Sequence, residues 1–165
     1  MKPESTVSYV SNGAKISNPR ILNTLGKQVN VLLPMQAYYY CYDVLITQLS
    51  YEVRCGMLIK TVNGLELGGI ATHPKNQGLV SVKENTRFVV KFQFKTQLNP
   101  GAYFLNAGVV ARGSNGESYL DRLIDAYLFK IMPYKNQLST GYVNFSAQKE
   151  DSRDMHLLSG LTYLK

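Results

Sequence analysis

The sequence predicts an all-β fold in which two antiparallel sheets pack face to face as a sandwich. Turn-forming pairs such as Asn12-Gly13, Asn63-Gly64 and Asn115-Gly116 recur at short intervals. Between them apolar and polar residues alternate, which is the period of a strand with one buried face. No segment before residue 150 has the 3.6-residue period and caps of a helix. The length of 165 residues fits one such domain.

The tyrosine-rich stretch from Met35 to Thr47 is predicted to be a strand. Asp43 and Thr47 are expected to face water, and counting back in twos places Cys41 and Tyr39 on the same side. The residues of the opposite parity are expected to face the core: Tyr38, Tyr40, Tyr42, Val44 and Ile46. The tyrosine cluster is therefore interpreted as a wall of the core, with hydroxyl groups near its edge.

A hairpin is predicted next, from Cys55–Val62 through Asn63-Gly64 to Leu65–Thr72, because Asn-Gly supplies the positive φ angles of two-residue turns. Three later strands follow from alternation. Their expected inward residues are Phe88, Val90, Phe92 and Phe94; then Tyr103, Leu105, Ala107 and Val109; then Tyr127, Phe129 and Ile131. Residues 142–147 are predicted to form a last short strand.

The expected organisation is a linker or edge segment at residues 1–13, a sandwich domain at residues 14–148, and a tail at residues 149–165. The tail begins with the charged run Lys149-Glu-Asp-Ser-Arg-Asp154 and continues with spaced leucines. It fits either a short docked helix or a frayed terminus, and the sequence leaves both open.

Composition argues against several classes of protein. The net charge of +7 comes from Lys and Arg residues without a run, which favours a solvated basic surface over a nucleic-acid partner. No apolar run approaches the length of a membrane span, and no signal-peptide pattern opens the chain, so a cytoplasmic location is expected. Cys41 and Cys55 fit no zinc or redox spacing and are predicted to be free, buried thiols.

The chain also lacks the motifs of an enzyme. It contains no G-x-x-x-x-G-K-[ST] phosphate loop and no G-x-S-x-G elbow. Asp121 and Asp125 could be imagined as paired glycosidase carboxylates, but such pairs are common by chance near strand ends. His73, before Pro74, is interpreted as a turn residue. No catalytic residue, cofactor or metal is therefore expected.

The strand after Pro100 presents a mixed outward row that includes Phe104, Asn106 and Arg112, whereas a solvated face usually carries more charge. With immunoglobulin-like strand order, Arg54 and Lys60 would face this row from one neighbouring strand and Thr72 from the next. Amides and guanidinium groups hydrogen-bond sugar hydroxyls, and an aromatic ring offers a platform for a pyranose. The candidate carbohydrate-binding residues are Arg54, Lys60, Thr72, Phe104, Asn106 and Arg112.

Two alternatives stay open at this point. The same row could be covered by another domain or subunit, which would make the chain a dimerisation or docking domain with no glycan of its own. A second candidate face on the other sheet is more heavily charged and resembles plain solvent surface. It carries Tyr39, Asp43, Arg87, Lys91, Gln93 and Lys95.

Several blocks, in order over roughly residues 14 to 147, resemble a known family. They are Cys55-Gly-Met-Leu-Ile59, Gly69-Ile-Ala-Thr72, Leu98-Asn-Pro-Gly-Ala-Tyr-Phe-Leu-Asn-Ala-Gly-Val109, Tyr119-Leu-Asp121, Asp125-Ala-Tyr-Leu-Phe129 and Gly141-Tyr-Val-Asn-Phe145. The chain is similar to the C-terminal carbohydrate-binding domain of Wzt, the ATP-binding subunit of ABC transporters that export O-antigen polysaccharide. The resemblance implies an immunoglobulin-like antiparallel β-sandwich that binds the non-reducing end of the polysaccharide.

The resemblance further implies a homodimer in which the last strand, about residues 141–148, is exchanged between subunits. It implies an ABC ATPase domain and a transmembrane subunit as partners, and a cytoplasmic location peripheral to the inner membrane. Because this chain has no phosphate loop, it is expected to be a fragment in which Met1 need not be the native start. The resemblance does not identify the glycan, and no binding residue of the family is assigned to a position of this sequence.

Overall fold

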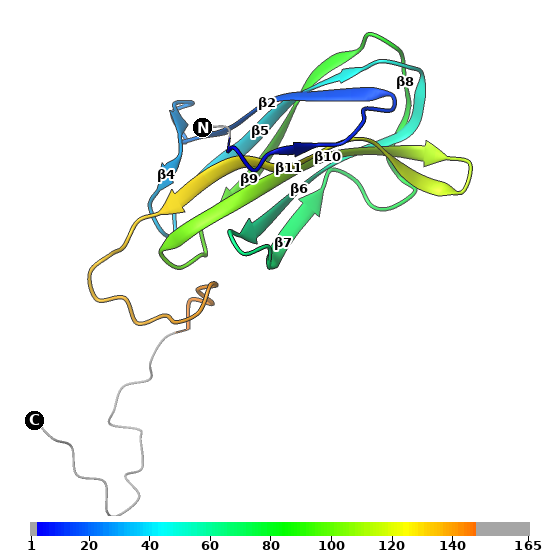
Figure 1. The fold of residues 1–165 in the computed structure, drawn as a ribbon. Coiled ribbons are helices and arrows are strands. Elements are labelled where there is room, and N and C mark those ends of the chain that lie inside the picture. The colour runs from blue at the N-terminus through cyan, green and yellow to red at the C-terminus, as the bar shows by residue number, and fades with distance from the viewer. Residues whose placement is uncertain (1–2, 148–165) are drawn as a thin grey trace, which may run out of the picture.

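The computed structural model describes residues 3–147, which form two β-sheets packed face to face (Figure 1). The strands are β1 (Val7–Ser8), β2 (Ala14–Leu22), β3 (Gln28–Val29), β4 (Val31–Leu32), β5 (Ala37–Ile46), β6 (Ser50–Thr61), β7 (Glu66–Ala71), β8 (Leu79–Val82), β9 (Arg87–Lys95), β10 (Gly101–Gly113) and β11 (Gly116–Ile131). No helix occurs in this part of the chain. The predicted all-β sandwich is confirmed.

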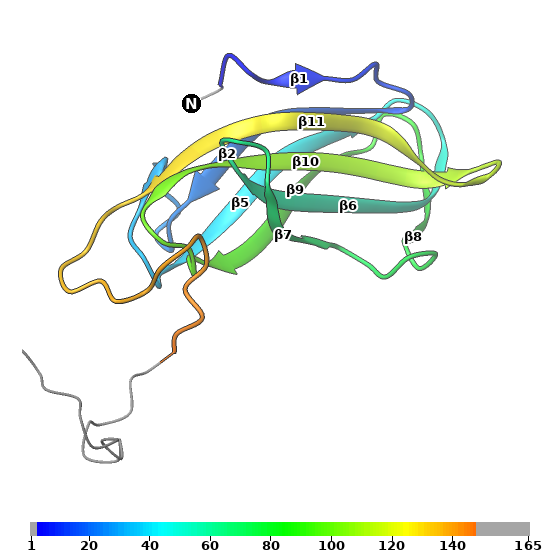
Figure 2. The same ribbon diagram turned by 60° about the horizontal axis from the view of Figure 1, so that its bottom comes forward.

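The larger sheet, sheet A, has the order β1-β11-β10-β6-β7, with β4 added to β11 and β8 added to β6. The smaller sheet, sheet B, has the order β3-β2-β5-β9. Every pairing is antiparallel except the short contact of β4 with β11. The N-terminal strand β1 lies along the outer edge of β11 (Figure 2). Most strand pairs join strands that are not consecutive in the sequence, so backbone hydrogen bonds connect distant parts of the chain.

The core lies between the sheets and follows the predicted alternation. Tyr38, Tyr40, Tyr42, Val44 and Ile46 of β5 are all buried, which confirms the interpretation of the tyrosine cluster as core. Aromatic rings from both sheets meet there: the Phe129 ring of sheet A stacks on Tyr103 of the same sheet, with centroids 5.7 Å apart, and lies edge to face with Phe94 of sheet B at 6.4 Å. Cys41 faces outward, as its parity requires, yet it is buried by its neighbours.

Both cysteines are free and buried, as predicted. Burial raises the pKa of the Cys55 thiol to about 12, and its hydrogen bond with Tyr42 acts in the opposite direction. The thiol is therefore neutral at physiological pH and behaves as a small apolar side chain.

The hairpins differ in detail from the prediction. At Asn63-Gly64 the backbone of Thr61 bonds to that of Leu65, so the loop has three residues, and only Gly64 has a positive φ, of 91°. The turn between β10 and β11 likewise uses one left-handed residue, Gly116. A three-residue loop of this kind needs a single left-handed residue, which glycine adopts without steric cost.

The longest strand, β11, has 16 residues, and the sequence predicted only its second half. Two irregularities interrupt its pairing with β10, between Leu105 and Ala107 and between Val109 and Val110. The second irregularity places one extra residue, Leu120, on β11 between the partners of Val109 and Val110. Such a bulge exchanges the faces on which the following residues lie, with consequences for the site described below.

The predicted last strand is not formed within the described residues. Val143 makes only an isolated bridge with Leu98, supported by backbone bonds of Asn99 with Tyr142 and of Asn144 with Gln97. Figure 1 shows the chain looping out past the end of β11 before this segment, drawn in orange, returns below the two sheets. The tail at residues 149–165 lies outside the described residues. Within residues 3–147, no helix is long and apolar enough to cross a membrane.

Candidate functional site

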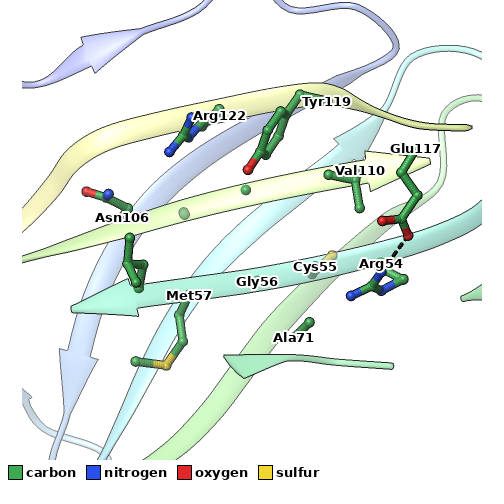
Figure 3. Close-up of a pocket in the computed structure, with 13 residues that line it drawn as sticks. Arg54, Cys55, Gly56, Met57, Ala71, Asn106, Val110, Glu117, Tyr119 and Arg122 are labelled. Carbon is green, nitrogen blue, oxygen red and sulfur yellow. Dashed lines mark hydrogen bonds and ion pairs between the residues drawn. The ribbon is translucent and has the colours of Figure 1, made fainter. Parts of the chain in front are cut away.

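The outer face of sheet A contains a hollow of about 250 Å³ that lies over β6, β10 and β11 (Figure 3). Its lining residues are Arg54, Cys55, Gly56, Met57, Leu58, Ala71, Asn106, Ala107, Gly108, Val110, Glu117, Tyr119 and Arg122. Gly56 of β6 and Gly108 of β10 are directly opposite each other in the sheet. Because neither carries a side chain, peptide backbone forms the floor of the hollow.

A core tyrosine holds this floor from below. The Tyr42 hydroxyl, which belongs to sheet B, lies 2.9 Å from the Gly56 carbonyl oxygen and 3.2 Å from that of Gly108. Burial raises the pKa of Tyr42, so the hydroxyl keeps its proton and donates. The tyrosine cluster thus contributes to the site from the core side, because the Tyr42 hydroxyl links the carbonyl groups of the two glycines on the floor of the hollow.

Replacing Tyr42 with phenylalanine is expected to destabilise the domain by about 1 to 3 kcal/mol, because the ring still fills the core while the two carbonyls lose a buried donor. Urea denaturation followed by circular dichroism measures the change. Tyr39→Phe on the outer face is the control and should leave stability within about 0.5 kcal/mol. An unchanged midpoint for Tyr42→Phe would show that the hydroxyl does not hold the floor.

An ion pair bounds one end of the hollow. Arg54 Nη1 lies 2.5 Å from Glu117 Oε1, and both side chains are largely buried. Arg54 Nε also donates to the His73 carbonyl oxygen at 2.9 Å. Arg54 is therefore anchored, and its charge is balanced by Glu117 before any ligand arrives.

Tyr119 and Arg122 of β11 form one wall (Figure 3). The Tyr119 side chain is 52% exposed although it is a large aromatic group. The Arg122 guanidinium carbon lies 5.0 Å from the centre of the Tyr119 ring, and no carboxylate in residues 3–147 forms an ion pair with it. The wall offers an aromatic surface beside a cation whose hydrogen-bonding capacity is available to a ligand.

Asn106 bounds the opposite end and is only 5% exposed. Its Oδ1 accepts a hydrogen bond from the backbone N–H of Asp125 at 2.9 Å, at the irregularity in β11. Its Nδ2 donates to no other group in the described part of the chain. The amide is fixed through its oxygen, so the Nδ2 donor has a defined position at the hollow.

The structure brings together two of the six residues nominated from the sequence, because only Arg54 and Asn106 line the hollow. Lys60 and Phe104 are cross-strand partners farther along the same face, and Lys60 Nζ lies 2.6 Å from Asp125 Oδ1 and 5.8 Å from the Phe104 ring centre. Thr72 Oγ1 accepts from the Cys55 N–H. Arg112, at the far end of β10, lies 3.3 Å from Glu52 and is 68% exposed.

Sequence reasoning missed the three β11 residues, Glu117, Tyr119 and Arg122. Tyr119 was quoted in a motif, but nothing in that motif indicated its face. The signal that could have located them is the turn at Asn115-Gly116, which returns the chain antiparallel beside Arg112 and Val110.

Comparison with known families decides the identity of the domain. The sequence matches the family described as "Wzt C-terminal domain" over residues 5–145. The chain belongs to the Wzt C-terminal domain family. The resemblance predicted from the ordered sequence blocks is therefore confirmed.

A solved structure supports the fold of this Wzt C-terminal domain. The crystal structure of the C-terminal domain of Wzt is similar to the chain with a TM-score of 0.79 and 24% identity, over 91% of this chain and 90% of that one. A Pseudomonas fluorescens alkylpurine DNA glycosylase bound to abasic-site DNA has a TM-score of 0.47 and 12% identity, over 74% of this chain and 31% of that one. The chain matches none of the curated proteins compared.

Several polar groups elsewhere in this Wzt C-terminal domain are already engaged with other groups of the protein. On the second candidate face, Asp43 is paired with Arg20 at 2.8 Å, and Lys91 Nζ lies 3.9 Å from the centre of the Tyr39 ring. Asp121 accepts from the Ile16 N–H at 2.6 Å and the Arg122 N–H at 2.8 Å, so it joins the sheets. No group of three potential metal ligands occurs in residues 3–147.

Proposed function

We propose that this domain recognises the non-reducing end of an O-antigen polysaccharide, without catalysis, for export by an ABC transporter. The observation that supports the proposal is the hollow on sheet A, which combines an exposed aromatic ring, an available guanidinium and a fixed amide over a floor of peptide backbone. Three paired strands supply these groups, so they are positioned before the ligand binds.

The chemistry of the hollow suits a sugar. Tyr119 offers an apolar face against which the C–H groups of a pyranose can stack. Arg122 and the Asn106 amide supply hydrogen-bond donors for hydroxyl groups, and the anchored Arg54–Glu117 pair adds both a donor and an acceptor. Membership of the Wzt C-terminal domain family supports such a ligand, because it favours a role in O-antigen export.

The resemblance also supplies the remaining parts of the proposal. The domain acts at the cytoplasmic face of the inner membrane, joined to an ABC ATPase domain and working with a transmembrane subunit, and it needs no cofactor. It forms a homodimer in which residues 141–148 are exchanged between subunits. In support of an exchange, Phe145 of this segment is 86% exposed, and within the described residues the segment is attached by one isolated bridge, from Val143 to Leu98, and two flanking backbone hydrogen bonds.

The test is a titration of the chain with O-antigen polysaccharide from the bacterium that encodes it, followed by backbone amide NMR shifts. An unrelated glycan of similar length is the control. We expect shifts confined to β6, β10 and the first half of β11, with the cognate glycan alone. Shifts on sheet B would move the site to the second face, and no response at millimolar chain ends would contradict glycan recognition.

Phe104 tests whether the glycan extends beyond the hollow. The ring lies two residues along β10 from Asn106 on the same face, so a second sugar residue would reach it. Phe104→Ala is expected to weaken binding by about 1 to 3 kcal/mol, by analogy with stacking losses on other aromatic platforms. Calorimetry measures the loss, and thermal unfolding checks the fold. Unchanged affinity would confine the contact to the hollow.

The alternative function is docking onto a larger assembly. It is favoured by the exposed apolar residues of the segment that follows β11, including Leu138 and Phe145. A domain that only docks would show no glycan response in the titration above and would bind the ATPase half of the transporter instead. The two readings therefore separate in one experiment.

A further inference from the structure

The floor of the hollow consists of two glycines in positions where the backbone does not require glycine. Gly56 and Gly108 lie in the interiors of β6 and β10, and neither has a positive φ. Glycine in a strand interior weakens the strand, because it loses more conformational freedom on folding and has no side chain to pack. Two of them directly opposite each other therefore need an explanation other than backbone geometry.

Packing within the domain does not require glycine at Gly56 either. A Cβ atom built there would meet only the Ile70 carbonyl oxygen, at the ordinary contact distance of 3.6 Å. By contrast, a Cβ at Gly69 would lie 2.2 Å from the Met57 carbonyl oxygen, so that glycine is explained by close packing of β7 on β6. At Gly108 a Cβ would lie 3.2 Å from the Tyr119 ring and would displace the wall of the hollow.

The space that the two missing side chains leave is the hollow itself. It is bordered by polar groups with unused hydrogen-bonding capacity, namely the Arg122 guanidinium and the nearly buried Asn106 Nδ2. Its volume of about 250 Å³ is slightly below the range of roughly 300 to 1,000 Å³ that small-molecule sites usually span. The hollow therefore suits one sugar residue rather than a run of residues.

We propose that the Gly56–Gly108 pair determines ligand specificity by setting the depth of the hollow, so that one terminal sugar residue rests directly on the peptide backbone between Tyr119 and Arg54. This inference rests on the proposed function, because it specifies how the same site selects its glycan. A side chain at either glycine raises the floor, and the sugar then loses contact with both walls.

The test compares two glycine-to-alanine variants of the full chain. Gly56→Ala adds a methyl group inside the hollow, and Gly68→Ala adds one on β7, where nothing lies within 4 Å of the new Cβ. Each is titrated with the cognate O-antigen polysaccharide by calorimetry, and each is melted to obtain Tm. We expect Gly56→Ala to bind about ten-fold more weakly or worse, with Tm not lowered, and Gly68→Ala to bind like the parent chain.

The outcomes separate this inference from the proposed function. If the parent chain binds and Gly56→Ala binds equally well, the glycine pair does not set specificity, although glycan recognition stands. If the parent chain itself does not bind, the proposed function fails and this inference fails with it. If both variants lose affinity equally, the loss comes from the strand backbone and not from the depth of the hollow, which also overturns the inference.

Discussion

Replacing Arg122 with glutamate is expected to weaken glycan binding by well over ten-fold. The guanidinium supplies the donors of the β11 wall, and it has no carboxylate partner in residues 3–147 that would share them. A hydrogen bond to a charged group contributes about 1.5 to 3 kcal/mol, which corresponds to a factor of roughly 10 to 150 in affinity. Glutamate removes these donors and adds a negative charge to the wall of the hollow.

The matched control is Arg87→Glu, which makes the same change of charge on an exposed residue of sheet B. It should leave the calorimetric affinity unchanged. Arg122→Lys keeps the charge but loses the planar donor group, and an intermediate affinity is expected. Equal losses for Arg122→Glu and Arg87→Glu would show that overall charge attracts the glycan and that the hollow does not select it.

Replacing Phe129 with alanine is expected to destabilise the domain by about 3 to 5 kcal/mol. The ring is completely buried, stacks on Tyr103 and meets Phe94 of the opposite sheet edge to face at 6.4 Å. Its loss would leave a cavity between the sheets that rigid strands cannot close. Urea denaturation measures the free energy of unfolding, and NMR then reports whether the sheet A face survives.

Phe145→Ala provides the comparison, because the same side chain is removed from a position that is 86% exposed. Phe145→Ala should change the free energy of unfolding of the monomer by no more than about 0.5 kcal/mol. A loss for Phe129→Ala below about 1 kcal/mol would mean that Phe129 is not packed between the sheets as described.

The fold could be predicted from the sequence wherever the alternation of apolar residues is unbroken. In β5, β9 and β10 every residue predicted to face the core does so, because a strand with one dry face has a strict period of two. The hairpin at Gly64 was also found, although its loop type was wrong, since an Asn-Gly pair fits both loop lengths.

The candidate site was harder to predict because it depends on an irregularity. Counting back in twos from Tyr127 would turn Tyr119 toward the core, but the bulge at Leu120 changes the parity and exposes its ring. Single-residue bulges have no reliable sequence signal. The partners of Arg54 and Asn106 were likewise hidden, because Glu117 and Asp125 approach them only through pairing between strands.

The last predicted strand is absent from the described residues for a different reason. Residues 142–147 alternate as a strand does, yet within the described residues Val143 finds only one bridge, to Leu98. Alternation of apolar and polar residues indicates which residues would share one face of a strand. It does not indicate whether a partner strand lies close enough to pair.

On β6 and β10, the side chains that pack in the core alternate with the positions that face outward to the hollow: Cys55 and Met57 belong to the core, while Gly56 lies on the floor between them. Substitutions at the outward positions can therefore change the shape and chemistry of the hollow while the buried positions keep the fold. An insertion of one residue would exchange the two sets and destroy both. A lineage built on this domain should accordingly vary the hollow by replacing residues on these strands, and should accept changes of length only in the loops.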